Sequence, residues 1–485
     1  MPKKPYAPPV PPECGKASLG LPPSVLAKRE KCDKNNTGCP TQVPYTARVD
    51  YDHWCDPNQP KSVIYKDVVK AHSVIKETIQ NTPLLMPKSK NLFDMELYLK
   101  IETLHESGSF HERSAIYALY MLSDEERADG VYTASIGNWG MALAHVGKKK
   151  GIKVTVVLPI KTSVDAVRRT QDYGAKVVIS GQNLEEARLE AFNLIKQHGA
   201  GTYINGYDHP HVIAGAGSIG IELMEQLPNI DAILIPVGGG GLLAGIATVV
   251  KTLKPDTLIY GVESYESCCF FKAMDNEKPY ATECSITAPL AVPTAGYNAF
   301  HTARSLIDKM VLVHSNWMNQ VILRMAEEER YIVEVSGAVA LAALFAKPYI
   351  VPELRDKRVV CIVTGANIAC IPLSRALEHG LAVEGRSVSI KISLPNDNTK
   401  EYYKVLKIIA NVGCNIIHYD SDNVWSTEDD LFKSYMTVMC STRGLQHSCT
   451  LKRVMEKLFP NKCQFADVPF CGTTKCPCFP KLWPL

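Results

Sequence analysis

The stretch Asp231-Ala-Ile-Leu-Ile-Pro-Val-Gly-Gly-Gly-Gly-Leu-Leu-Ala-Gly-Ile-Ala-Thr-Val-Val250 joins two apolar runs through four consecutive glycines. The first run predicts a buried strand, and the second predicts an apolar helix. Because Gly238 to Gly241 carry no Cβ atoms, their backbone N–H groups can close on a ligand at the N-terminus of that helix. The helix dipole favours negative charge there, so the stretch predicts a phosphate-binding turn.

Two other interpretations of this stretch compete with a phosphate site. One is a tight strand-to-helix turn, although four glycines exceed what a turn requires. The other is a membrane span, since residues 232–250 carry no charge over a sufficient length. Pro236 and the glycines lie in the middle of this run and would break a spanning helix. We therefore predict a turn in a soluble core, with no membrane association.

The composition of the whole chain is typical of a globular protein that binds small molecules. Its 485 residues are 46% hydrophobic and 21% charged, and this length allows two or three domains. Lys and Arg total 53 against 50 for Asp and Glu, so the net charge of +3 gives no general attraction to nucleic acid. The start, Met1-Pro-Lys-Lys-Pro-Tyr6, shows no apolar signal core, so we expect a cytoplasmic protein.

The sixteen cysteines include a group near each end of the chain. Cys14, Cys32, Cys39 and Cys55 lie in the N-terminal segment, and three more lie in residues 471–478. Neither group has the paired Cys-x-x-Cys spacing of zinc sites. We expect free thiols in a reducing cytosol and no metal.

Changes of pattern along the chain predict four parts. Residues 1–61 are rich in proline and cysteine and predict a disordered arm. Residues 62–385 alternate strand-like and helical runs, which predicts a parallel sheet covered on both faces. Residues 386–470 predict a compact β-α-β-β-α domain, and residues 471–485 form a tail. The predicted fold class is α/β for the body and α+β for the C-terminal domain.

Three polar or glycine-rich loops follow strand-like runs of the body. They are Ser107-Gly-Ser-Phe-His-Glu-Arg113, Ser135-Ile-Gly-Asn138 and the tetraglycine turn. In sheets of this kind, ligands bind beyond the carboxyl ends of the strands. We therefore expect these loops to meet around one cleft.

At these loops the sequence resembles the fold type II pyridoxal-phosphate enzymes, specifically the threonine/serine dehydratase and serine racemase family. The resemblance covers residues of about 62–380 and rests on motifs in the family's order. These motifs are Tyr98-Leu-Lys-Ile-Glu102, Ser107-Gly-Ser-Phe110, Ser135-Ile-Gly-Asn138, Asn205-Gly-Tyr-Asp208, Ile213-Ala-Gly-Ala-Gly217, Pro236-Val-Gly-Gly-Gly-Gly-Leu242, Gly261-Val-Glu263 and Glu334-Val-Ser-Gly337. The resemblance implies a tryptophan synthase β-like body of two lobes, with the smaller lobe at about 102–190. Residues 387–470 resemble the regulatory ACT-type domain, with Val412-Gly-Cys-Asn-Ile-Ile417 at its helix-to-strand turn.

The resemblance implies a site for pyridoxal 5'-phosphate and an amino acid. The implied cofactor contacts are Phe110, Asn138, Gly238, Gly239, Gly240, Gly241, Leu242 and Thr364. The implied substrate contacts are Ser135, Gly137 and Trp139. The glycines would hold the phosphate, Asn138 would face the pyridine hydroxyl and Thr364 would bond the ring nitrogen. Without a cofactor, these residues would form a tight turn, a loop-capping amide and a hydroxyl bonded to the backbone, and Ser135 would be a helix N-cap.

The sequence departs from the family at the residue that forms the Schiff base. The family pattern Ser-Phe-Lys-x-Arg-Gly-Ala reads Ser109-Phe-His-Glu-Arg-Ser-Ala115, so His111 stands at the position of the catalytic lysine. The covalent link requires a primary amine, and imidazole has none. Imidazole can still act as a base near neutral pH, because its unperturbed pKa is about 6.5. Lys100, the nearest lysine, belongs to the incoming strand, and we do not assign it this role.

Further departures alter the surroundings of this position. Ile136 stands where racemases of the family carry a hydroxyl, and it cannot transfer a proton. Trp139 replaces a histidine or similar polar residue, and Ser114 replaces a glycine. Thr364-Gly-Ala-Asn367 departs mildly from the family's Gly-Gly pair. Together these changes predict relaxed or redirected use of the site.

Three hypotheses follow for the function. The first is a catalytically impaired or inactive threonine/serine dehydratase-like protein of amino-acid metabolism, a pseudoenzyme that binds the cofactor without a covalent link. The second is an active threonine/serine ammonia-lyase, in which an amino acid already joined to the cofactor binds and His111 removes its α-proton. The third is a regulatory protein that pairs with an active paralogue, or with itself as a homo-oligomer. Its ACT-like domain would bind a small amino acid near residues 396–400 and Gly413.

Overall fold

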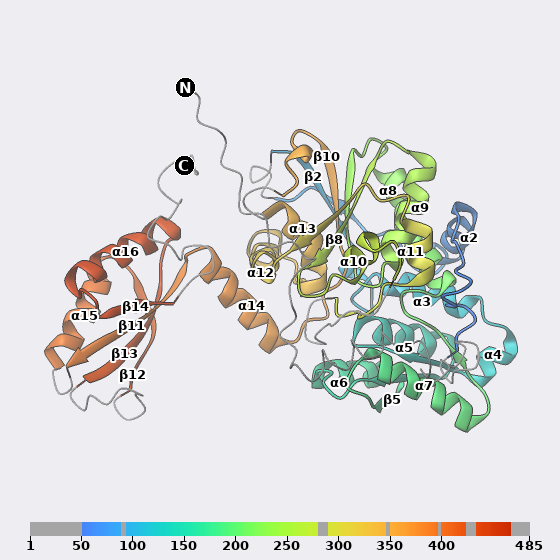
Figure 1. Cartoon of the computed structure of the whole chain (residues 1–485), viewed down its shortest axis with the longest axis horizontal. Helices are drawn as coiled ribbons and strands as arrows, with labels where there is room; N and C mark the ends of the chain where they lie inside the picture. The colour runs from blue at the N-terminus through green and yellow to red at the C-terminus, as the bar shows by residue number, and fades with distance from the viewer. Residues whose placement is uncertain are drawn as a thin grey trace, which may run out of the picture. The chain divides into compact units, whose positions relative to one another are not determined.

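The structure is a computed structural model, and it describes residues 51–88, 94–279, 290–345, 350–395, 399–422 and 433–466. These residues form an α/β body of two lobes and a C-terminal domain with an antiparallel sheet (Figure 1). Residues 1–50 of the predicted arm and the predicted tail at 471–485 lie outside the described residues.

A six-stranded sheet forms the larger lobe. Its strand order is β1-β2-β10-β7-β8-β9, and all pairings except that of β1 with β2 are parallel. The strands are β1 (Leu84–Leu85), β2 (Glu96–Ile101), β7 (Ala232–Pro236), β8 (Leu258–Ser264), β9 (Lys309–Val313) and β10 (Arg358–Val363). Every residue of β7 is buried, as expected for a central strand between two helical layers.

Helices cover both faces of this sheet. Ile233 and Ile235 of β7 pack in one apolar cluster with α8 and α9, whereas Leu234 packs in a second cluster with α12 and α13. The helices of the larger lobe are α2 (Tyr65–Ile75), α8 (Pro210–Gln226), α9 (Gly241–Leu253), α10 (Cys269–Asp275), α11 (Tyr297–Ala303), α12 (Ser315–Arg324), α13 (Val335–Phe345) and α14 (Cys370–Val383). Three shorter elements are η3 (Glu102–Leu104), the π-helix η4 (Met325–Glu329) and η5 (Pro352–Leu354). The uncharged run at 232–250 is thus core, with a strand and a helix on either side of the glycines.

The smaller lobe is built on a parallel four-stranded sheet in the order β5-β4-β3-β6. Its strands are β3 (Val131–Ala134), β4 (Val154–Leu158), β5 (Lys176–Ile179) and β6 (Thr202–Tyr203). The helices in this part of the chain are α3 (His111–Tyr120), α4 (Asp124–Asp129), α5 (Asn138–Lys150), α6 (Val164–Asp172) and α7 (Leu184–His198). Because β6 pairs with β3, this lobe extends past the predicted limit of about 190.

The C-terminal domain has an antiparallel sheet in the order β12-β13-β11-β14 and its own apolar core. Its elements are β11 (Ser387–Pro395), α15 (Thr399–Asn411), β12 (Asn415–Asp422), β13 (Lys433–Ser441), α16 (Leu445–Leu458) and β14 (Cys463–Phe465). The predicted β-α-β-β-α order is present, and β14 adds a strand that the short Cys463–Phe465 run did not reveal. The predicted α/β body with an α+β domain is confirmed.

The predicted N-terminal arm ends before residue 61. Cys55 is buried, and the ring of Trp54 lies 4.9 Å from the ring of His209. The side chain of Asn298 donates a hydrogen bond to the Trp54 carbonyl at 2.7 Å. These contacts bring together residues far apart in the chain, so a proline-rich composition could not predict them. Within the described residues, no helix is long and apolar enough to cross a membrane.

A buried network of charges joins β2, α3 and α8. Arg113 of α3 donates to Glu102 at 2.7 Å and to Glu222 of α8 at 2.5 Å. Lys100 of β2 donates to the other oxygen of Glu222 at 2.6 Å. Although burial raises the pKa of Glu102, Arg113 and His105 hold it well below its usual range. These four buried side chains tie the first turn of α3 to the larger lobe.

We expect Arg113→Met to lower the free energy of unfolding by about 3–5 kcal/mol, because it leaves Glu102 and Glu222 buried without their shared cation. Urea unfolding followed by circular dichroism measures this loss. Arg355→Met is the matched control, since Arg355 pairs with Asp94 at 3.2 Å on the surface, where an ion pair contributes little. Similar small losses in both variants would contradict a structural role for the network.

Candidate active site

A cavity of about 420 Å³ lies at the carboxyl ends of strands from both lobes. The segments that follow β2, β3, β7 and β10 contribute to its wall. All residues that the sequence assigned to the cofactor or substrate line this one cavity. They are Phe110, His111, Ser135, Gly137, Asn138, Trp139, Gly238, Gly239, Gly240, Gly241, Leu242 and Thr364.

Packing accounts for part of the tetraglycine turn. Gly240 has φ of 95°, in the left-handed region that favours glycine. A Cβ atom at Gly239 would lie 2.1 Å from the ring of Tyr207, and one at Gly240 would lie 2.3 Å from the ring of Phe270. A Cβ atom at Gly238 would meet nothing closer than 3.5 Å. The tight-turn interpretation therefore explains Gly239 and Gly240 without a ligand.

The same turn also fits a phosphate group. It ends at the first residues of α9, where backbone N–H groups have no acceptor within the helix. The helix dipole adds positive potential there, and the first turn of α9 carries no acidic side chain. Residues 238–242 all line the cavity, so these N–H groups are the candidate donors to a phosphate.

His111 begins α3 at the wall of the cavity. Its ring stacks on Phe110 with centroids 4.1 Å apart and meets the ring of Trp139 edge-on at 5.8 Å. Its Nδ1 atom is buried and has no hydrogen-bond partner within the described residues. Burial lowers the pKa of His111 to about 3, so the imidazole is neutral at physiological pH. Burial therefore makes His111 a weaker base than the solvated imidazole that the sequence argument assumed.

No lysine lines the cavity within the described residues. Lys100 is fully buried and donates to Glu222 at 2.6 Å, to the Thr82 carbonyl at 2.9 Å and to Gln226 at 2.8 Å. These bonds direct its ammonium group toward α8 and away from the cavity wall. The part of the cavity that the structure describes thus offers no primary amine to a carbonyl cofactor.

A chain of hydrogen bonds connects the two lobes at Asn138. Its amide donates to Glu334, and its oxygen accepts from Asn367 at 2.8 Å. Arg169 of α6 donates to the side-chain oxygen of Asn367 at 3.3 Å. Burial raises the pKa of Glu334, although bonds from Ser336 and Asn138 oppose this effect. Asn138 therefore bridges the lobes, which differs from the loop-capping role considered from the sequence.

Two predicted polar contacts have partners within the protein. The hydroxyl of Thr364 donates to the Ser336 carbonyl at 3.1 Å. The hydroxyl of Ser135 accepts from the amides of Gly137 at 3.1 Å and Gly140 at 2.9 Å. The bond of Thr364 matches the backbone-bonded hydroxyl that the sequence also allowed. Ser135 is not the N-cap of α5, because that position is Gly137, although its hydroxyl accepts from the amide of Gly140 in the first turn of the helix. Both side chains still border the cavity.

The segment at 135–139, which the resemblance assigns to the substrate, contributes two large apolar side chains to the cavity wall. Trp139 is buried, and its Nε1 donates to Thr133 at 2.8 Å. A Cβ atom at Gly206 would lie 2.4 Å from the Trp139 ring, so the indole fills the space beside that glycine. Ile136 also lines the cavity. This wall therefore has no proton-transfer group at position 136 or 139.

Other residues that line the cavity received no role from the sequence. Four polar ones among them are Arg188, Tyr207, Glu334 and Asn367. Tyr207 and Glu334 belong to motifs on which the resemblance rests, so those motifs could have indicated that both residues line the site. Arg188 lies on α7, where its sequence neighbours are those of an ordinary polar helix. Only the packing of α7 against the cleft identifies it.

Several known proteins are similar to this chain in sequence and fold. The family model for pyridoxal-phosphate dependent enzymes matches residues 75–365. An L-threonine ammonia-lyase of Geobacter sulfurreducens is 32% identical over 386 residues, which are 79% of this chain and 94% of that protein. A catabolic L-threonine dehydratase of Staphylococcus aureus is 33% identical over 330 residues, which are 67% and 94% of the two chains.

Two solved structures are similar as well. The processed form of threonine deaminase isoform 2 from Solanum lycopersicum is 31% identical, with a TM-score of 0.59 over 66% of this chain and 95% of that one. Serine racemase from Dictyostelium discoideum is 31% identical, with a TM-score of 0.58 over 64% of this chain and 100% of that one. Given the parallel-sheet body, the glycine turn at its cavity and these matches, the chain belongs to the family of pyridoxal-phosphate dependent enzymes and has threonine ammonia-lyases and serine racemases among its relatives.

Proposed function

We propose that this protein is a cytoplasmic, threonine/serine dehydratase-like protein of amino-acid metabolism that binds pyridoxal 5'-phosphate without a covalent link and lacks the family's lysine-dependent activity. The observation that carries this proposal is the cavity wall, which contains His111 and no lysine among the described residues.

Cofactor binding and chemistry depend on different parts of the cavity. Residues 238–242 would hold the phosphate, and none of their contacts requires the side chain at position 111. Phe110, Asn138 and Thr364 would border the ring. When bound, the cofactor supplies an electron sink for amino-acid chemistry. The neutral imidazole of His111 can pack against it, and its two ring nitrogens can donate one hydrogen bond and accept another.

An active lyase that uses His111 as its base is the second candidate. General bases are most effective when their pKa lies near the working pH. Burial lowers the pKa of His111 to about 3, which makes it a weak base. Ile136 and Trp139 supply no alternative group on the substrate loop. The geometry therefore favours the impaired protein over the active lyase.

We expect borohydride treatment of the wild type with pyridoxal 5'-phosphate to leave no covalent adduct on peptides of the cleft. His111→Lys should give an adduct at position 111, because it restores the primary amine. Peptide mass analysis reads both results. The rate of ammonia release from threonine by this variant should stay at least about 100-fold below that of an active threonine ammonia-lyase. The reason is that Ile136 and Trp139 still stand where the family carries polar side chains.

His301→Lys is the matched control for this experiment, since His301 is exposed on α11 and should give no adduct in the cleft. An adduct on a cleft lysine of the wild type would contradict the proposal. Rapid ammonia release from threonine by the wild type would instead favour the active lyase.

A regulatory role would rest on the C-terminal domain. β12 lies at the edge of its sheet, and Ile417 and Tyr419 are 58% and 60% exposed. An exposed apolar edge strand can pair with the strand of another chain. An ACT-like domain that joins two copies, or this chain and a related one, is consistent with that edge. The amino-acid site predicted near residues 396–400 and Gly413 stays a prediction, and residues 396–398 lie outside the described residues.

We expect the full-length protein to sediment as an oligomer and Ile417→Lys to shift it toward the monomer, because a charge on an edge strand opposes pairing. Tyr403→Lys is the control, since Tyr403 is 63% exposed on the helix α15 and is not part of the edge strand. Analytical ultracentrifugation compares the three proteins. A monomeric wild type, or an oligomer that survives Ile417→Lys, would rule out pairing through β12.

A further inference from the structure

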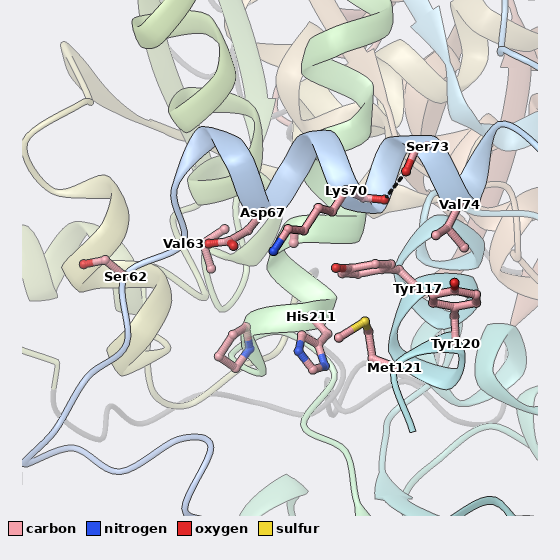
Figure 2. A pocket seen from close by; sticks show the side chains of 12 residues that line it. Ser62, Val63, Asp67, Lys70, Ser73, Val74, Tyr117, Tyr120, Met121 and His211 are labelled. Carbon is pink, nitrogen blue, oxygen red and sulfur yellow. Dashed lines mark hydrogen bonds between the residues drawn. The ribbon is translucent and has the colours of Figure 1, made fainter. Parts of the chain in front are cut away.

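A second cavity, of about 500 Å³, lies between α2, the C-terminal half of α3 and the start of α8 (Figure 2). It shares no lining residue with the cofactor cavity. Its upper wall is one side of α2, and its other walls come from α3 and α8. It is therefore a separate space in the body.

Two opposite charges face this space. Asp67 and Lys70 extend from the same side of α2 into the cavity (Figure 2). Within the described residues, no ion pair joins them, and the Lys70 ammonium has no hydrogen-bond acceptor. Asp67 accepts one hydrogen bond, from the amide of Ile64 at 3.2 Å. Most of its carboxylate and the whole ammonium group of Lys70 thus remain available to a ligand.

The wall that faces these charges is aromatic and apolar. Tyr117 is buried, and its ring meets that of His211 edge-on with centroids 5.7 Å apart. Burial lowers the pKa of His211, so its ring is neutral and adds no charge. Tyr120 and Met121 line the cavity from the end of α3 (Figure 2). These rings and the thioether form a surface for a large apolar group.

We propose that this cavity binds a zwitterionic α-amino acid with a large apolar or aromatic side chain. Its carboxylate contacts Lys70, its ammonium contacts Asp67, and its side chain packs on Tyr117, Tyr120 and Met121. A simple anion would leave Asp67 facing a like charge, and a simple cation would do the same for Lys70. A cavity of this size also has room for a side chain much larger than that of threonine.

The helix α3 extends from one cavity to the other. His111 in its first turn lines the cofactor cavity, and Tyr117 in its last turns lines the second one. Arg113 ties the first turn to Glu102 and Glu222. A ligand in the second cavity would thus contact the C-terminal half of the helix whose first turn presents His111.

The segment 207–211 provides a second connection. Tyr207 lines the cofactor cavity and lies against Gly239, where a Cβ atom would approach its ring to 2.1 Å. The ring of His209 accepts from the amide of His211 at 3.2 Å, and His211 lines the second cavity. Occupation of this cavity thus alters the affinity of the glycine turn for phosphate, by a coupling that must be reciprocal. This coupling rests on the proposed function of the cofactor cavity. The proposal of an amino-acid site in the second cavity is independent of that function.

Calorimetry on the full-length protein without cofactor tests the ligand class with three probes. They are L-phenylalanine, 3-phenylpropanoate, which lacks the ammonium, and 2-phenylethylamine, which lacks the carboxylate. We expect L-phenylalanine to bind and each analogue to bind about tenfold more weakly, because each leaves one charged group without its partner.

Substitutions in α2 test whether L-phenylalanine binds in the second cavity. Lys70→Met should weaken the binding of L-phenylalanine about tenfold, the effect of losing one hydrogen bond to a charged group. Lys66→Met should leave it unchanged, since Lys66 is exposed on α2 and does not line the cavity. Asp67→Asn should weaken L-phenylalanine and not 3-phenylpropanoate. The proposed site would be wrong if none of the three probes gave a heat of binding, or if Lys70→Met left the affinity for L-phenylalanine unchanged. Equal affinity for L-phenylalanine and 3-phenylpropanoate would contradict the proposal that the ligand is a zwitterion.

The coupling has its own readout. Pyridoxine 5'-phosphate, which has no aldehyde to react with an amino acid, reports the affinity of the cofactor cavity. Saturating L-phenylalanine should shift that affinity several-fold in the wild type, and Lys70→Met should need about ten times more L-phenylalanine to reach the same shift. An unchanged affinity in the wild type would overturn the coupling alone. Failure of pyridoxine 5'-phosphate to bind at all would overturn the proposed function and leave the amino-acid site standing.

Discussion

The buried guanidinium of Arg113 holds the part of the structure on which both cavities depend. It bonds to Glu102 beyond β2 and to Glu222 on α8, and so it sets where α3 begins. Any movement of α3 would leave buried charges without partners, which is costly. The helix therefore keeps its place whatever side chain stands at position 111, two residues earlier. This constraint maintains the shape of the cavity independently of the residue at that position.

Much of the body could be predicted from the sequence because its signals are local. The uncharged run before the glycines predicts a central strand, and the three loops lie at strand ends, so they meet at one edge of the body. The neutral state of His111 could not be predicted, because its low pKa comes from burial by residues distant in sequence. The bridge from Asn138 to Glu334 joins residues 196 apart. Such contacts depend on how the lobes pack, which no local pattern records.

The tetraglycine turn shows why a motif alone does not establish a ligand. Tyr207 and Phe270 pack so closely on Gly239 and Gly240 that side chains there would disrupt the core. These glycines are required for stability even if no phosphate binds. The hydroxyls of Ser135 and Thr364 likewise have partners within the protein. A protein that lost catalysis would retain all of these residues for structural reasons, so cofactor binding must be measured directly.

The central claim is that the cavity binds the cofactor through its phosphate and ring, with no covalent contribution. Calorimetric titration of the wild type with pyridoxal 5'-phosphate and with pyridoxine 5'-phosphate tests this most directly, because the two compounds differ only where a Schiff base would form. We predict dissociation constants within a few-fold of each other. Binding of the aldehyde that is tighter by orders of magnitude, or no binding of either compound, would contradict the account.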